Sequence, residues 1–290
     1  MQHKKWLFLS ILALTWGSSF ILIKKALIGL NPIEIGAFRI LIAGFILLLI
    51  GGPKLLKIKR HFWKPLLIVA FAGTFIPVFL FSFAVREIDS AVAAVLNSLT
   101  PLLTLILGAL FFKFSFSKKQ IFGTLLGLAG TLALLLNSAL ENPTKNYGYA
   151  FLVLIAASGY AFSVNFIKTK LPKLDTVSIT TATFTVLIPP TLMVLCFSGF
   201  FDKAISDPLV LSSLGYVTIL AALGTSMAML LFNKLIQISS PVFSASVSYL
   251  ITVVAVIWGI IDGEKLTFIQ LAAAALVIYG VIKAQRKTSN

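Results

Sequence analysis

Long apolar stretches separated by short polar breaks dominate the chain. The stretch 33–50, for example, carries apolar residues on all faces of a helix and does not alternate with polar positions. A helix needs about 20 consecutive, mostly apolar residues to cross a bilayer. The pattern predicts ten transmembrane helices, at 6–28, 33–50, 63–84, 90–112, 119–139, 148–167, 176–198, 209–232, 240–261 and 267–283.

The composition agrees with a membrane protein. Of the 290 residues, 59% are hydrophobic and 11% are charged, which is more apolar surface than a soluble fold of this length can bury. An outer-membrane β-barrel would need segments of alternating polarity, and these stretches do not alternate. The predicted fold class is therefore an all-α membrane protein, in which each helix satisfies its own backbone polar groups within the lipid.

The basic residues are concentrated in alternate loops. The net charge of +15 would suggest a nucleic-acid partner in a soluble protein, but 17 of the 24 Lys and Arg residues lie in the two termini and alternate loops, against 6 in the other loops. Such an excess marks the cytoplasmic side. We therefore expect both termini in the cytoplasm, no nucleic-acid partner, and a multi-pass protein of the bacterial inner (plasma) membrane. The first stretch lacks a signal-peptide cleavage site and is expected to remain as the first helix.

The two halves of the chain repeat one another. At offsets near 150 and of 144 residues, the matched positions include Gly73-Thr74 with Gly224-Thr225, Phe81 with Phe232, and Trp16 with Tyr160. The predicted units are 6–138 and 148–284, with five helices each. An odd number of spans makes the second unit enter the membrane from the opposite side, so the sequence predicts an inverted repeat, an architecture common in transporters.

Three short motifs resemble those of a known family. They are Trp16-Gly17-Ser18-Ser19-Phe20, Phe38-Arg39, and the run Gly259-Ile260-Ile261-Asp262-Gly263-Glu264-Lys265-Leu266-Thr267 before the last helix. With the length and the duplication, they resemble the EamA-type branch of the drug/metabolite transporter superfamily over nearly the whole chain. The resemblance implies ten helices, cytoplasmic termini, a central cavity between the repeats, and export of small metabolites, amino acids or drugs by alternating access. The chain departs from the family pattern at Phe114, where an acidic residue is expected.

Arg39 is the only basic residue well inside a predicted span. A charge there costs roughly 2.5–3.5 kcal/mol unless it is paired or faces water. One interpretation is that the guanidinium binds an anionic or carboxylate group in the cavity through two parallel donors. The other is an outer gate in which Arg39 pairs with Glu264 or Asp262, since the equivalent positions Thr183 and Phe114 are both uncharged. Both interpretations remain open at this point.

Aromatic and polar residues near mid-span supply the other candidates. Trp16 and Tyr160 occupy equivalent places, where they either form aromatic walls of a cavity or only pack between helices. Amides and hydroxyls beside Pro101, and at the equivalent places in the second half, either contact a ligand or satisfy the helix backbone. The predicted substrate-binding residues are Trp16, Ser19, Arg39, Asn97, Tyr160, Asn165, Ser244, Ser248 and Tyr249.

Motifs for enzyme chemistry are not found in the sequence. The two histidines, His3 and His61, lie in loops, and there is no phosphate-binding motif or pair of carboxylates within a span. We expect no enzyme activity, no cofactor and no metal site; the expected partners are a small-molecule substrate and membrane lipid, and the expected state is a monomer. The first helix also lacks the acidic residue that antiporters of the small multidrug resistance type use, which favours neutral, zwitterionic or anionic cargo.

The leading hypothesis is a secondary transporter that exports amino acids or related small metabolites through a central cavity by alternating access. Its first alternative is a transporter of amphipathic or lipid-linked compounds, which would need a lateral opening. The second is a membrane scaffold or enzyme that transports nothing. A scaffold, however, would not need polar residues at matched mid-membrane positions.

Overall fold

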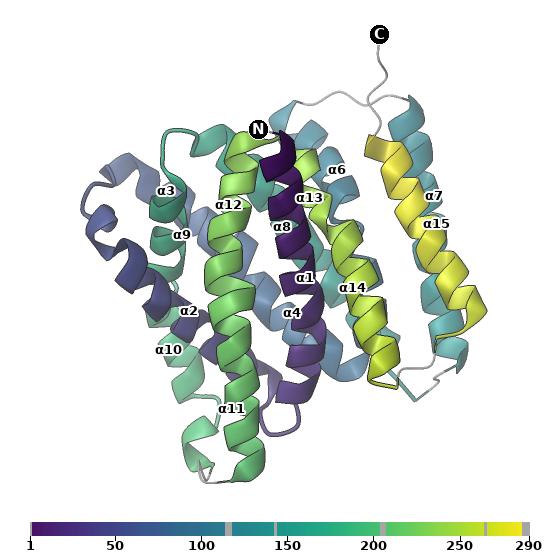
Figure 1. Ribbon diagram of the computed structural model, residues 1–290, viewed down its shortest axis with the longest axis horizontal. Coiled ribbons are helices and arrows are strands. Elements are labelled where there is room, and N and C mark those ends of the chain that lie inside the picture. The colour runs from purple at the N-terminus through teal and green to yellow at the C-terminus, as the bar shows by residue number, and fades with distance from the viewer. Residues whose placement is uncertain (1, 114–117, 142–143, 204–206, 264–265, 286–290) are drawn as a thin grey trace.

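The protein is a bundle of helices. A computed structural model describes residues 2–113, 118–141, 144–203, 207–263 and 266–285, and within these ranges it contains no β-strand. Most helices run roughly alongside one another, and Figure 1 shows that the first helix begins and the last helix ends at the same end of the bundle.

All ten predicted segments are helical. The elements of the first half are α1 (Gln2–Ala26), α2 (Pro32–Leu55), α3 (Trp63–Ala70), η2 (Phe71–Phe75), α4 (Ile76–Glu87), α5 (Ser90–Asn97), α6 (Thr100–Phe112) and α7 (Lys118–Glu141). Those of the second half are α8 (Ala150–Lys170), α9 (Thr176–Thr185), α10 (Ile188–Cys196), α11 (Pro208–Ala221), η5 (Ala222–Met227), α12 (Ala228–Ile238), α13 (Pro241–Ala245), α14 (Val247–Ile261) and α15 (Phe268–Gln285). Three short 3₁₀ turns, η1 (Arg60–Phe62), η3 (Tyr147–Tyr149) and η4 (Phe200–Asp202), lie in the connections.

Capping residues set the starts of several helices. The Asn31 side chain accepts a hydrogen bond from the Glu34 backbone amide while the Glu34 carboxylate accepts one from the Asn31 amide, a reciprocal capping box at the start of α2. Asp175 and Asp207 accept backbone hydrogen bonds in the same way at the starts of α9 and α11. Polar residues in the short connections therefore fix where the helices enter the bundle.

Among the described residues, eight helical segments are long and apolar enough to cross a membrane. They are 3–26, 32–55, 60–87, 90–112, 147–170, 176–196, 208–238 and 241–261. Two shorter apolar stretches, Leu125–Leu134 in α7 and Phe268–Gly280 in α15, lie in the segments predicted as the fifth and tenth spans. The chain also exposes many large apolar side chains, for example Leu49 at 71% and Phe151 at 68%, as expected for a surface that faces lipid.

Two of the long helices contain a π-helical turn at matched places. The segment η2 interrupts the helix formed by α3 and α4, and η5 interrupts the helix formed by α11 and α12. The two π turns contain the matched pairs Gly73-Thr74 and Gly224-Thr225. A hydropathy pattern does not distinguish a π turn from an ordinary turn of α-helix, so the two π turns are not predicted by the apolar stretches.

Other predicted helices are also interrupted. The fourth divides into α5 and α6 just before Pro101, and the seventh divides into α9 and α10 just before Pro189, because proline lacks the N–H that would continue the backbone ladder. The ninth divides into α13 and α14 at Ser246, without a proline at that point. The fourth and the ninth helices are thus both interrupted within their first half.

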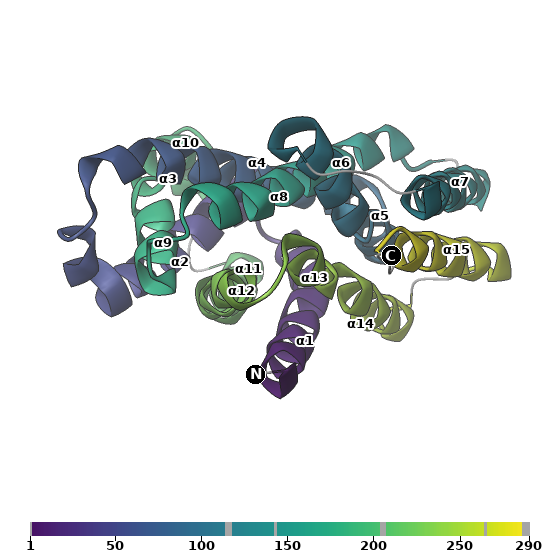
Figure 2. The ribbon, with the colours of Figure 1, turned by 90° about the horizontal axis from the view of Figure 1, so that it is seen from above.

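Each half places its first helix against the other half. Helix α1 packs mainly on α11, α12 and α14, whereas α8 packs mainly on η2, α4 and α6. In Figure 2, α8 lies near the middle of the molecule and α1 runs from there to the lower edge, with α2 and α9 together on the left. The halves are therefore interleaved, and the space between them belongs to both.

Helices α7 and α15 form a pair at the edge of the bundle. They contact each other far more than any other element, and both views place them side by side at one edge (Figures 1 and 2). A Cβ built on Gly130 would lie 2.8 Å from the Val277 backbone nitrogen, so the glycine permits close approach of the two helices. This pair leaves the centre of the bundle to the eight long apolar segments.

Candidate functional site

A cavity lies between the two halves of the chain. The cavity has a volume of about 110 Å³, which is several times the space that one water needs. The wall is formed by α1, α2, η2, α4, α5 and α6 from the first half and by α8, α9, η5, α12, α13 and α14 from the second. No described residue of α7 or α15 belongs to it.

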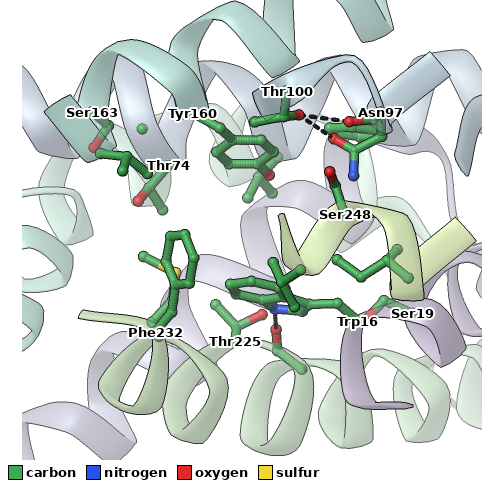
Figure 3. Close-up of a pocket in the computed structure, with 18 of the residues that line it drawn as sticks. Trp16, Ser19, Thr74, Asn97, Thr100, Tyr160, Ser163, Thr225, Phe232 and Ser248 are labelled. Atoms are coloured by element: carbon green, nitrogen blue, oxygen red, sulfur yellow. Dashed lines mark hydrogen bonds between the residues drawn. The ribbon is translucent and has the colours of Figure 1, made fainter. Parts of the chain in front are cut away.

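Two aromatic pairs form opposite parts of the wall. The rings of Trp16 and Phe232 meet edge to face with centroids 4.9 Å apart, and those of Phe81 and Tyr160 are stacked at 5.9 Å. The Trp16 indole nitrogen also donates a hydrogen bond of 2.8 Å to the Gly224 carbonyl in η5 (Figure 3). Each pair joins a first helix of one half to the π-containing helix of the other. Trp16 and Tyr160 therefore each form part of the cavity wall together with an aromatic ring from the other half.

Glycines in the π turns let two serines approach closely. A Cβ built on Gly224 would lie 2.9 Å from Ser19 Oγ, and one built on Gly73 would overlap the Ser163 hydroxyl. Contacts this short do not occur with real side chains, so a larger residue at Gly224 would displace the Ser19 hydroxyl, and one at Gly73 would also press on the Ser163 Cβ of α8. Ser19 and Ser163 are themselves matched positions of the repeat, which gives both sides of the cavity the same glycine–serine contact.

Polar groups gather where the fourth and ninth helices are interrupted. Thr100 Oγ1 donates to the Asn97 carbonyl at 2.6 Å and also lies 3.2 Å from Asn97 Oδ1. Figure 3 shows the Asn97 amide and the Ser248 hydroxyl facing each other across the cavity edge. The Ser248 hydroxyl donates to the Ala245 carbonyl at 3.0 Å. The interruption thus brings an amide and hydroxyls to the cavity without leaving broken backbone bonds exposed.

Arg39 is buried in the cavity wall with only one hydrogen bond. Its side chain is 8% exposed, and its Nε donates to Thr225 Oγ1 in η5 at 2.7 Å. Within the described ranges, Arg39 forms no ion pair, and its two terminal nitrogens donate no hydrogen bond. A guanidinium at this depth therefore has donors to offer to a ligand or to water.

Ion pairs occupy the end of the molecule where α1 ends, which we call the Lys24 end. Asp262, just after α14, accepts from Lys24 at 2.7 Å and from Lys25 at 2.5 Å, and these hydrogen bonds hold the pKa of Asp262 below its ordinary value. Lys203 reaches the fully buried Glu34 at 2.6 Å. Charged contacts between α1, α2 and the second half therefore close this end.

The opposite end, where α8 ends, is called the Lys168 end. Lys168 Nζ donates to three carbonyls where α12 ends, those of Ile236, Gln237 and Ser239, at 2.7–3.0 Å. Nearby, Lys54 and Asp175 form an ion pair at 2.8 Å. Burial alone would raise the pKa of Asp175, but hydrogen bonds from Lys54 and Ser178 outweigh it and hold the pKa at about 2.

Six of the predicted substrate-binding residues line the cavity. They come from α1, α2, α5, α8 and α14, and they are Trp16, Ser19, Arg39, Asn97, Tyr160 and Ser248. Their distribution over both halves agrees with the positions expected from the repeat.

The other predicted residues lie elsewhere. Asn165 Nδ2 donates to the Thr104 and Ala161 carbonyls, and the Ser244 hydroxyl bonds to Ser239 and Ser240, so both satisfy groups within the helix packing. Tyr249 packs against the main apolar core and does not belong to the cavity wall. Glu264, the proposed gate partner of Arg39, lies outside the described residues; Asp262, two positions earlier, is held by lysines.

Several cavity residues did not enter the predicted set. Thr74, Thr100, Ser163, Thr225, Phe232 and Asn233 all line the wall. Five of them are visible in the sequence as matched positions of the repeat or as neighbours of Pro101, but these signals do not show which side chains face a cavity. Asn233 had no such signal. Among the described residues, no group of three or more His, Cys, Asp or Glu side chains could hold a metal ion.

Comparison with known proteins identifies the family. The model of the EamA-like transporter family matches residues 4–136 and 148–283, almost the whole chain in two copies. The chain therefore belongs to this family of membrane transporters.

Proteins similar to this chain are also named as transporters. An uncharacterized inner membrane transporter, YedA of Escherichia coli strain K12, is 29% identical over 280 residues, which cover 93% of this chain and 87% of YedA. An uncharacterized transporter of Archaeoglobus fulgidus is 30% identical over 182 residues, 61% of this chain and 62% of that protein. A solved crystal structure with 19% identity has a TM-score of 0.66 and covers 96% of this chain and 95% of its own, which supports the fold alone.

Proposed function

We propose that the protein is a secondary transporter that exports small metabolites, such as amino acids or related neutral and zwitterionic compounds, through the central cavity. The observation that carries the proposal is Arg39: a buried guanidinium in the cavity wall whose terminal nitrogens have no partner among the described side chains. A membrane-buried cation without a counter-ion needs a ligand or water, and a carboxylate fits its two parallel donors.

The rest of the wall suits an apolar part of the same substrate. Beside the Trp16–Phe232 and Phe81–Tyr160 pairs, the cavity is lined by large apolar residues such as Ile23 and Phe184. Binding sites of small molecules combine such an apolar lining with a few placed polar groups. A compound with a carboxylate at one end and an apolar side chain therefore matches the wall.

Of the two roles considered for Arg39, we favour substrate binding over an outer gate. Its Nε is directed at Thr225, and the acidic residue nearest in sequence to Glu264, Asp262, is already held by two lysines. A gate would require Arg39 to pair with Glu264. In that case the double variant Arg39→Glu with Glu264→Arg should restore the transport that either single variant loses; for a substrate contact, the double variant stays inactive.

Alternating access would proceed by exchange of conformations between the halves. We infer that α7 and α15 also cross the membrane, which makes ten spans, and that the two five-helix units have opposite orientations with both termini in the cytoplasm. The interleaved packing of α1 and α8 and the matched π turns support this arrangement. Labelling of single cysteines at Lys145 and at Lys287 from the two sides of the inner membrane tests it, because the two should react from opposite sides.

We infer that the transporter is a monomer, because both copies that the family model matches lie in this one chain. No catalytic residue set is assigned, and we infer that the protein moves its substrate unchanged. Size-exclusion chromatography with light scattering tests the first point. Recovery of the substrate chemically intact after transport tests the second.

Transport itself is tested with purified protein in proteoliposomes. Vesicles loaded with a panel of labelled L-amino acids should release at least one of them faster than protein-free vesicles. Arg39→Ala and Arg39→Gln should reduce that release by about tenfold or more, since a charge-assisted hydrogen-bond pair is lost. The exposed Lys170→Gln serves as control and should retain wild-type rates. Equal release by wild type and Arg39→Gln would contradict the proposed role of Arg39, and no release of any compound would contradict the transport proposal.

A further inference from the structure

Two buried polar atoms in the cavity residues have no partner. Thr74 Oγ1 and Asn233 Oδ1 make no hydrogen bond to any described residue, although Thr74 is 3% and Asn233 1% exposed. Buried polar groups are nearly always satisfied, and one left without a partner is unfavourable. Each of these oxygens is an acceptor without a partner among the described residues, and each belongs to a residue of the cavity wall.

Thr74 differs from its matched residue in the other half. Thr225, in η5, donates its hydroxyl proton to the Leu220 carbonyl at 3.1 Å and accepts from Arg39 Nε at 2.7 Å. Thr74 occupies the same place in η2 and has neither contact. The same threonine in the same π turn is therefore saturated in one half and free in the other.

The difference between Thr74 and Thr225 follows from a residue on another helix. The residue that matches Arg39 in the second half is Thr183, whose hydroxyl donates to its own backbone at the Ile179 carbonyl, 2.7 Å away. Threonine is too short to reach across as the arginine does. The place that corresponds to the Arg39 guanidinium is thus left without a nitrogen donor beside Thr74.

The orientation of the Asn233 amide is fixed by its neighbour. Asn233 Nδ2 donates to Thr180 Oγ1 at 2.8 Å, and that hydroxyl already donates its proton to the Thr176 carbonyl at 2.8 Å. Thr180 can therefore only accept from Asn233, so the amide nitrogen must face Thr180. This leaves Oδ1 as an acceptor on the other side of the amide.

Another free hydroxyl lies beside Thr74. Ser163 Oγ forms no hydrogen bond with the described residues, in contrast to its matched residue Ser19, which donates to the Thr15 carbonyl at 3.0 Å. Figure 3 shows Thr74 and Ser163 next to each other on one side of the cavity. Two hydroxyls without a partner among the described residues therefore lie together there, and Asn233 lines the same cavity.

We propose that Thr74 and Asn233 form a subsite for a nitrogen donor of the substrate, an ammonium or amide N–H group. At Thr74, this donor would take the place of a second guanidinium, which the repeat would supply if the residue that matches Arg39 were also an arginine. The inference rests on the proposed function, in which Arg39 binds the carboxylate. A ligand that satisfies both places must carry an acceptor anion and an N–H donor together. A simple carboxylate or phosphate leaves the oxygens of Thr74 and Asn233 unpaired and binds more weakly.

The test compares ligands that differ only in the amino group. Isothermal titration on protein in lipid nanodiscs uses L-valine, L-leucine and L-phenylalanine, each beside its counterpart without the amino group: 3-methylbutanoate, 4-methylpentanoate and 3-phenylpropanoate. Wild type should bind at least one amino acid about tenfold more tightly than its counterpart. Thr74→Val should reduce this preference by about tenfold, because it weakens binding of the amino acid and leaves binding of its counterpart unchanged. Thr74→Ser should retain the preference. Asn233→Leu provides a second, independent removal of an acceptor and should also lower the preference.

A matched control separates the hydroxyl from the substitution itself. Thr131, in α7, is equally buried but donates to the Gly127 carbonyl at 2.9 Å, away from the cavity. Without ligand, Thr131→Val should lower the melting temperature, whereas Thr74→Val should leave it unchanged or raise it because a partnerless hydroxyl is removed. A lower melting temperature for Thr74→Val would contradict the observation on which the subsite rests.

The outcomes distinguish this subsite from the proposed function. If Arg39→Gln weakens both members of a ligand pair while Thr74→Val and Asn233→Leu leave the preference unchanged, the transporter proposal stands and the subsite is overturned. Wild-type protein that binds both members equally would also overturn the subsite. If none of the six compounds binds, the carboxylate site at Arg39 is contradicted, and the subsite with it.

Discussion

The two ends of the molecule hold matched lysines in different ways. Lys24 and Lys168 are equivalent residues of the repeat, yet Lys24 contacts the Asp262 carboxylate, whereas Lys168 contacts three backbone carbonyls at the end of α12. A carboxylate can be protonated and its ion pair is screened by salt, but carbonyls at a helix terminus keep their partial charge at any pH. The contact of the lysine therefore depends on pH and salt at the Lys24 end and depends on them much less at the Lys168 end.

This difference bears on how a transporter could open. If the two ends open in turn, the Lys24 end must separate Asp262 from two lysines, and the Lys168 end must remove an ammonium group from three carbonyls. The first step becomes easier at high salt or low pH. The second step has to find new partners for a charge and three carbonyls at once, which predicts a stronger dependence on the single side chain of Lys168.

The largest effect is expected from Lys168→Met. The variant removes three hydrogen bonds from a charged donor, so the free energy of unfolding should fall by about 2–3 kcal/mol. Thermal unfolding of the purified protein measures it, and the loss should be similar at low and high salt. Lys170→Met, on an exposed position two residues later, is the control. A loss no larger than that of the control would remove the contrast between the ends.

A smaller effect, dependent on pH, is expected from Asp262→Asn. Two partly exposed ion pairs are lost, which should cost about 1 kcal/mol at pH 7 and low salt. The pKa of Asp262 is lowered in the folded protein, so its contribution is fully present above the ordinary carboxyl pKa of about 4 and disappears as the pH falls through the lowered value. The melting temperatures of variant and wild type should therefore converge in acid and at high salt. A difference that persists under both conditions would show that the ion pairs do not cause it.

The smallest effect is expected from Lys54→Met at the Lys168 end. The two partners are 47% and 53% exposed, so the pair should contribute no more than about 0.5 kcal/mol. The pKa of Asp175 is held at about 2, and whatever the pair contributes is present above about pH 4 and lost as the pH falls toward 2. Thermal unfolding between these pH values tests the sign. Asp175→Asn, which retains a capping oxygen for α9, separates the ion pair from the helix cap.

Much of the fold could be predicted from the sequence. Helix positions followed from apolar stretches, because a segment in lipid must satisfy its own backbone and must be apolar over its whole length. The repeat was visible because matched glycines and aromatics, such as Gly73 with Gly224 and Phe81 with Phe232, are required at the same contacts in both halves. Each of these features depends on residue type and local spacing.

The site could be predicted only in part. Asn165 and Ser244 are polar residues near mid-span like Asn97, but their side chains bond to the backbone or hydroxyls of neighbouring turns, and nothing in their own sequence separates these outcomes. The contact between Arg39 and Thr225 joins residues 186 positions apart through a π turn. A π turn holds one residue more than an α-helical turn, and this extra residue changes which face of α12 meets the cavity. The apolar pattern does not reveal it, so Asn233 was not predicted.

The π turns also carry information about the history of the chain. A π turn arises where a helix accommodates one extra residue, and each half of this protein has such a turn at the same glycine–threonine pair. One insertion in an ancestor of the two halves, before its sequence was duplicated, would account for both. The different neighbours of the two threonines, Arg39 on one side and Thr183 on the other, would then be substitutions that followed the duplication. The cavity's present asymmetry would be the younger feature and its π turns the older one.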